Sequence, residues 1–402
     1  MEFKEAKFVP FILGGDINTY SVARAFYEAY EIESYVFGKY QAGPSYGSKL
    51  AHYTAVSDIE TEEGFLRTIH AFLDAHPDKT IILIGCGDGY TALISKFISS
   101  LPRCVAPYPE YSLMDQLQKK DRFYELCEKN GVDYPDTVVY TRDMGTDFAM
   151  EFSYPVIVKS SESVTYWDHP FEGQKKVFSV DTREELERVL KKIYDSGYEN
   201  PVIIQDTIPG NDEFMYVLTS YSNQEGVVEM MCLGHVLLEE HTPKGLGNHA
   251  CIITAFEKNL MDQARKLLED MNYVGFSNFD IKYDSRDGKY KFFELNTRQG
   301  RSNYYVTASG CNIASYVVDD YIYGKKHDLT LVNNEYLWMV VPKRVAFKHV
   351  KSEKSKRKMR KLISEGKWVN PVFFMRDLAF DRLYRISRTH FGHFEKFEKY
   401  YR

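Results

Sequence analysis

The sequence predicts a mixed α/β and α+β protein that ends in a basic helical tail. Three observations support this fold class. Apolar strand-like runs alternate with helical stretches before residue 110, strand-like segments dominate residues 211–342, and the charge changes sign near residue 343. A chain of 402 residues is long enough for two or three domains of ordinary size.

The first hundred or so residues have the pattern of a parallel, doubly wound sheet. The expected strands are residues 8–13, 35–37 and 80–84, and the expected helices are about residues 18–30, 62–75 and 90–100. The first strand runs into Gly14-Gly15-Asp16 and then a helix, an entry that suits binding at a helix N-terminus. Three prolines between residues 102 and 109 mark the end of this domain.

Residues 111–342 indicate two further domains. A helix at about 112–130 ends at Asn130-Gly131, and another is expected at about 182–196 among mixed strands. Beyond residue 210 the chain is rich in strands, with helices near 257–271 and 311–321. The sequence therefore divides into four predicted parts, residues 1–110, 111–210, 211–342 and 343–402.

Residues 343–402 are strongly basic. They contain 18 Lys and Arg against 6 Asp and Glu, whereas the whole chain has a net charge of −6. We expect two helices here, at residues 345–366 and 371–389. The charge suits an anionic substrate, or anionic lipid in a peripheral membrane contact. The alternative is a solvated helical pair packed through apolar side chains such as Trp368 and Phe373. No further motif supports binding of nucleic acid.

The composition favours a cytoplasmic protein. No apolar run reaches the roughly 18–20 residues that a membrane span needs. The six cysteines are scattered, without C-x-x-C pairs or metal-finger spacing, and we expect them to be reduced thiols.

Three oxygen-bearing side chains lie on two segments that read as neighbouring strands of a hairpin. Asp280 is in SNFDIKYD, and Glu294 and Asn296 are in YKFFELN, with turn residues between the two segments. Residues two apart in a strand face the same side, so Glu294 and Asn296 point together and the hairpin brings Asp280 alongside. Two carboxylates and an amide oxygen suit Mg²⁺, which completes its coordination with water and nucleotide phosphates. The alternative is a surface hairpin with ordinary charges.

Lysines stand at both ends of a polar loop that could close over phosphates. Lys159 ends a buried strand, where a cation needs a partner and a phosphate is a good one. The loop that follows contains Gly173, Lys175 and Lys176. Lys120 lies in a predicted helix, where taken alone it reads as a solvated residue.

The segment VIIQDTIPGNDEF suits a hinge between domains. A buried strand runs into Gln205 and Asp206, and the backbone here suits the edge of an adenine ring. Asp212 or Glu213 then supplies an acid for ribose hydroxyls.

Two arginines and two histidines border the predicted site. Arg298 and Arg301 directly follow the expected metal ligands, and an arginine there can clamp phosphate or carboxylate bidentately. His241 and His249 lie in a nearby segment, although a loop histidine is more often simply solvated.

The segment Gly85-Cys86-Gly87-Asp88-Gly89 suggests a different function. A G-x-G-x-G pattern after a strand resembles the first motif of methyltransferases that bind S-adenosylmethionine. That function needs an acidic residue near position 105, where the chain has the proline-broken RCVAPYPEY instead. Such glycines more often only make a tight turn between a strand and a helix.

Taken together and in this order, the residues resemble the ATP-grasp superfamily. These ligases hold ATP between two α+β subdomains behind a Rossmann-like N-terminal domain. The resemblance implies two nucleotide lysines, an adenine hinge, a ribose acid and a set of Mg²⁺ ligands. These are, in that order, Lys120 and Lys159; Gln205 through Asp206 to Ile208; Asp212; and Asp280, Glu294 and Asn296.

Within that superfamily, residues 8–345 are similar to the D-aspartate ligases of Gram-positive peptidoglycan synthesis. The segments that carry the similarity are ILGGDINTYSVARAF, IGCGDGYTALISK, FEGQKKVF, MMCLGHVLLEEHTP, GFSNFDIKYDSRDGKYKFFELNTRQGRS and YLWMVVPKR. The resemblance implies that the β-carboxylate of D-aspartate is joined to the side-chain amine of L-lysine in a nucleotide-linked muramyl peptide. A ligase for another amino acid or amine is the main rival, and an oligomer is compatible with the sequence.

Some positions depart from related ligases. Ser160 follows Lys159 where many ATP-grasp proteins have proline, and Asp206 stands where the hinge commonly has glutamate. Asn278 stands where D-alanine–D-alanine ligases have arginine, so a ligase of the alanine type is less expected.

The chemistry that the residues suggest agrees with the resemblance. A carboxylate is a poor electrophile, and phosphoryl transfer from ATP converts it to an acyl phosphate that an amine attacks. Lys159, with Lys120 or Lys176, would neutralise the ATP phosphates. Arg298, with Arg301 beside it, would stabilise the transferring phosphoryl group. The sequence identifies no general base.

Overall fold

A computed structural model describes residues 6–243 and 245–401, and these form two compact units. The first contains residues 6–114, 211–243, 245–279 and 296–401, and the second contains residues 115–210 and 280–295. The four domains expected from the sequence divide the chain differently, since residues 280–295 of the expected third domain belong to the second unit, and they stay a prediction. Residues 1–5 of the first expected domain and residue 402 of the tail lie outside the described residues.

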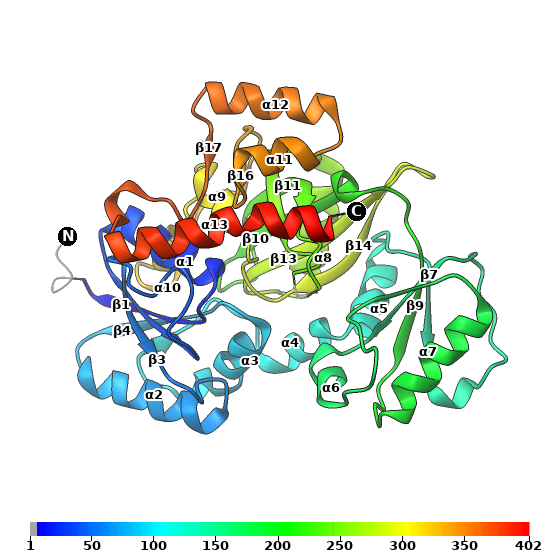
Figure 1. Cartoon of the computed structure of the whole chain (residues 1–402). Coiled ribbons are helices and arrows are strands. Elements are labelled where there is room, and N and C mark those ends of the chain that lie inside the picture. The colour runs from blue at the N-terminus through cyan, green and yellow to red at the C-terminus, as the bar shows by residue number, and fades with distance from the viewer. Residues whose placement is uncertain (1–5, 244, 402) are drawn as a thin grey trace. The chain divides into compact units, whose positions relative to one another are not determined.

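The first unit opens with a parallel five-stranded sheet in the order β3-β2-β1-β4-β5 (Figure 1). Its elements are β1 (Phe8–Leu13), α1 (Ile17–Tyr30), β2 (Ser34–Gly38), β3 (Ala51–Ala55), α2 (Glu62–Ala75), β4 (Thr80–Gly85), α3 (Asp88–Phe97), η1 (Ile98–Ser100) and β5 (Cys104–Val105). All of β1 is buried, because Phe8 and Ile12 share a core with α1 while Phe11 and Leu13 share a second core with α2. The doubly wound sheet that the sequence predicts is therefore confirmed.

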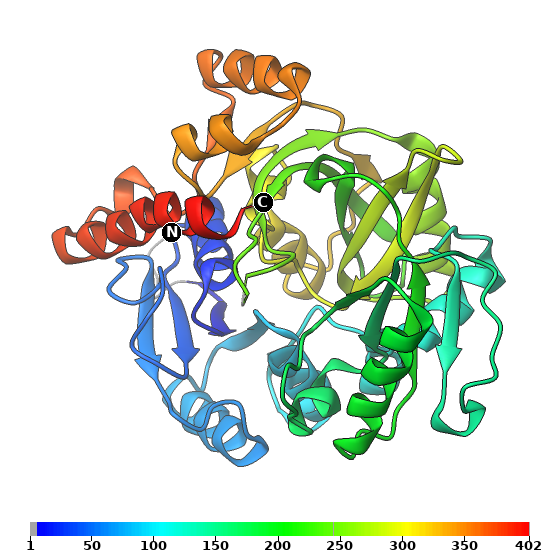
Figure 2. The same ribbon diagram turned by 45° about the vertical axis from the view of Figure 1, so that its right-hand side comes forward.

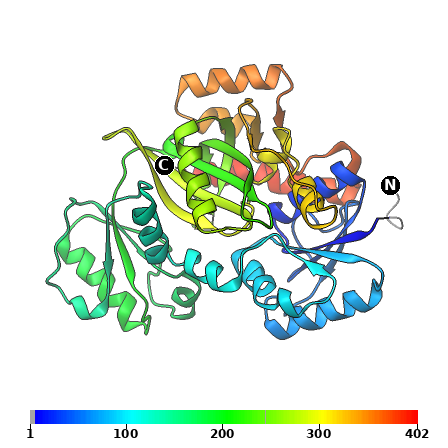
Figure 3. The same cartoon turned by 180° about the vertical axis from the view of Figure 1, so that it is seen from behind.

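A larger, mostly antiparallel sheet follows, in the order β14-β13-β10-β11-β12-β16-β17, with β15 beside β11. Its elements are η3 (Asp212–Phe214), β10 (Met215–Ser222), β11 (Val228–Glu239), β12 (His249–Ala255), α8 (Lys258–Asp270), β13 (Gly275–Asp284), β14 (Lys289–Asn296), α9 (Tyr304–Ala308), α10 (Ile313–Tyr321), β15 (Thr330–Leu331), β16 (Leu337–Met339) and β17 (Trp368–Val369). Figure 3 shows α8 lying against this sheet, where it contacts β11. Both expected helices are present, and the short helix α9 is additional.

The second unit is built on a four-stranded antiparallel sheet in the order β6-β9-β7-β8. Its elements are α5 (Lys120–Asn130), β6 (Thr137–Tyr140), η2 (Arg142–Met144), β7 (Val156–Ser160), α6 (Ser163–Asp168), β8 (Phe178–Val180), α7 (Arg183–Asp195) and β9 (Val202–Asp206). The helix α7 buries Leu186, Leu190 and Ile193 against valines of the sheet.

The prediction of a single helix at about 112–130 is wrong, because the chain forms two helices there, α4 (Tyr111–Gln118) and then α5. Lys119 between them has an extended backbone, with φ −88° and ψ 119°. The amide of Lys120 donates to the carbonyl of Ser161 at 3.2 Å. A contact 41 residues away in the chain thus takes the place of a helical hydrogen bond.

The tail also differs from the expected pair of helices. It consists of α11 (Lys343–His349), α12 (Glu353–Ser364), β17, η4 (Met375–Asp377) and α13 (Phe380–Tyr400). The first expected helix breaks after residue 349, and Ser352 starts the next one by accepting from the amide of Ser355. The second helix was expected to begin at residue 371, but it begins nine residues further along the chain and continues to Tyr400.

The tail is an integral part of the first unit. Its strand β17 pairs with β16, and α13 (red) lies beside the N-terminal sheet (Figure 2). Asp377 and Arg382 form a fully buried ion pair at 3.2 Å. The Asp377 carboxylate also accepts from the hydroxyls of Tyr20 and Ser48, at 2.8 and 2.7 Å, and from the amide of Lys49 at 2.7 Å. These bonds join the tail to α1 and to the loop after β2.

Asp377→Asn is expected to lower the free energy of unfolding by about 3 kcal/mol, because Arg382 is left as a buried cation without its counter-charge. Asp381→Asn, at an exposed position on α13, is the matched control and should change stability by less than about 0.5 kcal/mol. Equilibrium denaturation of the two variants measures the difference. Equal stability would contradict the anchoring role of Asp377.

Candidate functional site

Lys159 lies on the face of β7 opposite the core of the second unit. The alternate residues Val156 and Val158 are fully buried in that core, so the lysine side chain points to the other face. Its Nζ is 3.2 Å from the hydroxyl of Tyr124 and 5.4 Å from the ring centroid of Phe293. Burial, with a contribution from a neighbouring lysine, lowers the pKa of Lys159 to about 7. Its surroundings therefore oppose the charged form of this amine.

Lys120 and Glu294 form a second, directly paired element of the same cluster. Lys120 is buried at the start of α5, and its Nζ lies 3.2 Å from Oε2 of Glu294 on β14. Burial acts to raise the pKa of Glu294, but nearby lysines outweigh it and hold that pKa well below its usual range. These lysines are Lys120, Lys176 and Lys159 in order of effect. Lys176 is exposed in the loop before β8, yet its charge reaches this carboxylate.

The hairpin brings two of the expected metal ligands together. Asp280 on β13 is within hydrogen-bonding reach of the Glu294 side chain. Two carboxylates at this separation repel each other unless a proton or a cation lies between them. Asn296 follows two residues after Glu294 on the same strand, so the alternation of β14 turns both to one face.

This set of donors fits Mg²⁺. Two carboxylates and an amide oxygen leave room for the water and phosphate ligands that Mg²⁺ keeps. Among the described residues, no group of three or more His, Cys, Asp or Glu side chains is arranged to hold a metal ion. The expected set contains only two such residues and an asparagine, so it stays a prediction.

The expected adenine hinge lies at the end of β9. Gln205 is buried, and its Nε2 donates to the hydroxyl of Thr137 at 2.8 Å. Its Oε1 and the hydroxyl of Thr207 are buried and have no hydrogen-bond partner in the described structure. Asp206 forms an ion pair with Arg286, while the carbonyl of Ile208 accepts from Lys282 at 2.8 Å. Unsatisfied buried polar atoms are costly, so this segment suits a ligand that supplies polar groups.

Asp212, the expected ribose acid, belongs to the first unit. It is buried, and its carboxylate accepts from the amide of Glu239 at 2.9 Å and lies 3.0 Å from Nε2 of His241. That hydrogen bond raises the pKa of His241. His249 lies in strand β12, where burial lowers its pKa to about 4 and keeps it neutral. The expectation of simply solvated loop histidines is therefore wrong for both residues.

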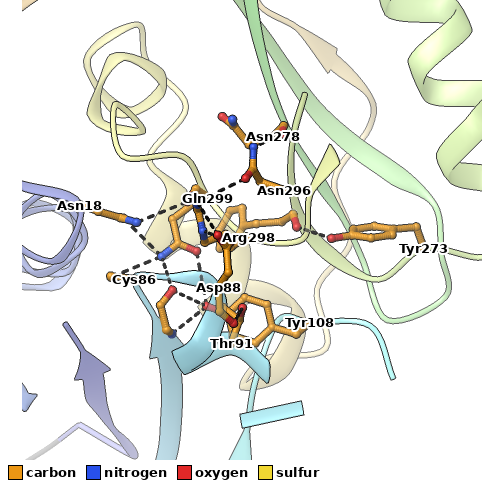
Figure 4. Close-up of polar contacts among 12 residues, drawn as sticks. Asn18, Cys86, Asp88, Thr91, Tyr108, Tyr273, Asn278, Asn296, Arg298 and Gln299 are labelled. Atoms are coloured by element: carbon orange, nitrogen blue, oxygen red, sulfur yellow. Dashed lines mark hydrogen bonds and ion pairs between the residues drawn. The ribbon is translucent and has the colours of Figure 1, made fainter. Parts of the chain in front are cut away.

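Arg298 lies in a polar network of the first unit (Figure 4). Its Nε donates to Asp88 at 2.6 Å, and its Nη2 donates to Oδ1 of Asn296 at 3.3 Å. Asn296 in turn donates to the carbonyl of Asn278 at 3.2 Å. The side chain of Asn278 is buried, and its oxygen accepts a hydrogen bond from the hydroxyl of Thr219. This contact fixes the backbone of β13 at Asn278.

Asp88, the acidic partner of Arg298, was not singled out from the sequence. It is the first residue of α3 and lies in the glycine-rich segment considered there for S-adenosylmethionine. In the same turn, the amide of Gly85 donates to the hydroxyl of Tyr108, and its carbonyl accepts from Gln299 at 3.0 Å. A β-carbon at Gly85 would lie 2.8 Å from Thr91, so the glycine permits a tight turn. The available signal in the sequence was an acidic residue inside the glycine-rich segment, between Gly87 and Gly89.

Arg301 has two acidic neighbours in the first unit. It lies 3.8 Å from Asp16, the N-cap of α1, and 3.8 Å from Glu240. Glu240 is buried after β11 and lies 3.7 Å from Nε2 of His393 on α13. Burial acts to raise the pKa of Glu240, but His393 and Arg301 outweigh it and lower that pKa.

The structure thus collects five predicted side chains within the second unit: Lys120, Lys159, Lys176, Asp280 and Glu294. The hinge residues belong to the same unit. Asp212, Asn296, Arg298 and Arg301 belong to the first unit, where each has the polar partners described above. Among the described helices, none combines the length and apolar character that crossing a membrane requires.

Comparisons with known proteins include a relative that matches nearly the whole chain. No protein-family model matches. A D-aspartate ligase from Enterococcus faecium (strain Aus0004) is 36% identical over 408 residues, covering 98% of this chain and 97% of the relative.

Solved structures with a similar fold have much lower sequence identity. N5-carboxyaminoimidazole synthetase from Staphylococcus aureus, complexed with ADP, has a TM-score of 0.62 at 14% identity and covers 98% of both chains. The biotin carboxylase domain of Hydrogenobacter thermophilus 2-oxoglutarate carboxylase, in a complex with MgADP, has a TM-score of 0.63 at 14% identity. That alignment covers 83% of this chain and 74% of the other. These two likenesses concern the fold alone.

Proposed function

Because this chain belongs to the D-aspartate ligase family, within the ATP-grasp superfamily, we propose that it joins D-aspartate to a peptidoglycan precursor. In general terms the chain is an ATP-dependent carboxylate–amine ligase. The proposed donor is the β-carboxylate of D-aspartate, and the proposed acceptor is the side-chain amine of L-lysine in a nucleotide-linked muramyl peptide. The products are the amide, ADP and phosphate.

The observation that carries this proposal is the cluster of lysines and carboxylates in the second unit. Lys120, Lys159 and Lys176 outnumber Asp280 and Glu294, so the cluster suits the phosphates of ATP. Binding of phosphates would favour the protonated form of Lys159, whose pKa burial lowers. Gln205 and Thr207 offer unpaired buried oxygens for the base of the nucleotide.

The reaction proceeds through two displacements. A carboxylate oxygen of D-aspartate attacks the γ-phosphorus of ATP, ADP leaves, and an acyl phosphate forms. The neutral amine of lysine then attacks the acyl carbon, phosphate leaves, and the departing phosphate or a water molecule takes the proton that the nitrogen loses. These steps mainly require positioned reactants and cancelled charge, which the cluster supplies.

Asp280, Glu294 and Asn296 are the proposed Mg²⁺ ligands. When bound, Mg²⁺ supplies positive charge against the ATP phosphates. In the first unit, we assign Arg298 to stabilisation of the transferring phosphoryl group, with Arg301 beside it. Asp88 would position Arg298, since it holds the guanidinium through Nε and Nη2.

The acceptor also suggests a location. A nucleotide-linked precursor and ATP are cytoplasmic compounds, so the proposed site of action is the cytoplasm. In the tail, Trp368, Phe373 and Phe374 pack against the core of the first unit, whereas Met375, Phe380 and Phe391 are exposed. The membrane contact expected for the tail therefore stays a prediction.

The decisive experiment is ADP release with Mg²⁺-ATP while D- and L-amino acids are scanned with a muramyl pentapeptide linked to a nucleotide. ADP should appear only when D-aspartate and the acceptor are present together. Mass spectrometry of the product should show one added aspartyl residue. Turnover with another amino acid or amine would keep the ligase and withdraw these substrates, and ATP binding without any turnover would withdraw the proposed reaction.

A further inference from the structure

A cavity of about 710 Å³ lies in the first unit between the C-terminal helix α13 and the N-terminal sheet. The loop after β2, the start of α1, and α13 line most of it. Its polar lining includes Asp16, Glu240, Arg301, Arg385, Arg388 and Lys396. A volume of this size holds a group much larger than an amino acid.

The walls of this cavity are fixed by buried contacts. The guanidinium of Arg382 donates to the carbonyl of Pro44 at 3.0 Å, and it pairs with Asp377. One turn further along α13, Arg385 donates to the carbonyl of Tyr46 and stacks on its ring, 4.7 Å from the centroid. The helix is therefore held against the loop that forms the opposite wall.

The charges of the lining leave an excess of cations. Glu240 is satisfied by Arg301 and His393, and Asp16 caps α1 by accepting from two backbone amides. Both carboxylates therefore have partners. Four cationic side chains face these two carboxylates, and Arg388 and Lys396 are exposed on the cavity side of α13.

Arg301 also has an unused donor. Its Nη1 is buried and has no hydrogen-bond partner within the described part of the chain. A buried guanidinium nitrogen without an acceptor is costly, and a phosphate or carboxylate oxygen would satisfy it.

We propose that this cavity binds the diphosphate of the nucleotide-linked acceptor, with Arg388 and Lys396 as its main cationic contacts. The assignment rests on the proposed function, because that function supplies an acceptor carrying a diphosphate. A diphosphate carries more negative charge and more acceptor oxygens than a single carboxylate, so it suits a lining with an excess of cations. The long side chains of Arg388 and Lys396 can reach it from successive parts of one helix. The basic tail thereby acquires a defined role as the wall of a substrate site.

The test is the double variant Arg388→Gln/Lys396→Gln in the full-length protein. Deleting the tail would remove strand β17 and the buried Asp377–Arg382 pair, so substitutions are the cleaner change. The control is Lys399→Gln, an exposed lysine of the same helix that does not line the cavity. The acceptor KM should rise about tenfold in the double variant, with the KM of D-aspartate and kcat little changed. The control should match the wild type.

Two acceptors distinguish the diphosphate from other anions. With the nucleotide-linked peptide the double variant should lose affinity, whereas with the same muramyl peptide lacking the nucleotide its kinetics should equal those of the wild type. An equal loss with both acceptors would assign the cations to peptide carboxylates and overturn the proposal. An unchanged KM with both would also overturn it.

A direct binding measurement separates this proposal from the proposed reaction. The binding of uridine diphosphate is measured by calorimetry in the absence of ATP. Uridine diphosphate should bind the wild type and the Lys399→Gln control with equal affinity, and it should bind the double variant about tenfold more weakly. If this difference appears while no ligation occurs, the site stands and the proposed reaction fails. If ligation occurs and uridine diphosphate binds all three proteins equally, the site fails and the reaction stands.

Discussion

Glu294→Gln is expected to lower kcat/KM for ATP about a thousandfold while the second unit stays folded. The substitution removes the carboxylate that pairs with Lys120 at 3.2 Å and that we assign to Mg²⁺. Glutamine keeps an oxygen that can accept from Lys120, so the fold loses little. Steady-state ADP release and thermal unfolding measure the two effects.

The matched control for this substitution is Glu125→Gln on the exposed face of α5, where the carboxylate pairs with Arg122. It should leave kcat/KM within about twofold of the wild type. Asp280→Asn should reproduce the loss and raise the Mg²⁺ concentration needed for half-maximal rate. Near-normal turnover of Glu294→Gln would show that its carboxylate serves only the hairpin.

Lys159→Met is expected to lower kcat/KM for ATP by about two to three orders of magnitude without lowering the free energy of unfolding. The side chain is a partly buried cation whose charged form desolvation and Lys120 oppose. Methionine keeps much of the apolar stem and removes that charge. The variant should therefore lose activity while it keeps its stability. A variant that failed to fold would lose both.

The pH dependence of stability offers an independent check on Lys159. Its pKa is about 7 in the folded protein and about 10.5 in an unfolded chain. Between these values the unfolded chain binds more protons, so the free energy of unfolding rises with pH in this window. Below pH 7 the lysine is protonated in both states and its contribution is constant.

The measurement compares wild type and Lys159→Met by denaturation from pH 6 to 10. The wild type should gain stability relative to the variant as the pH rises above 7. Lys191→Met, at an exposed lysine of α7 paired with Asp195, is the control and should show no such gain. A parallel pH profile for wild type and Lys159→Met would mean that Lys159 keeps its ordinary pKa.

Local sequence patterns were sufficient to predict the elements that carry most of the proposed site. The apolar run of β1 and the glycines after it predict a buried strand and a turn, because these follow from the preferences of adjacent residues. Asp280 and Glu294 could be paired from the sequence because a hairpin with a short turn has few alternatives. Lys159 was recognisable as a cation at the end of a buried strand.

The sequence by itself determined the fold class, the doubly wound sheet and the family to which the chain belongs, since these depend on local periodicity and on motifs along the chain. Only the tertiary structure decided the break at Lys119, the pairing of Arg298 with Asp88, and the anchoring of the tail through Asp377. These three features depend on partners 41, 210 and 357 residues away. Contacts at such separations follow from the packing of whole elements, which no local pattern specifies.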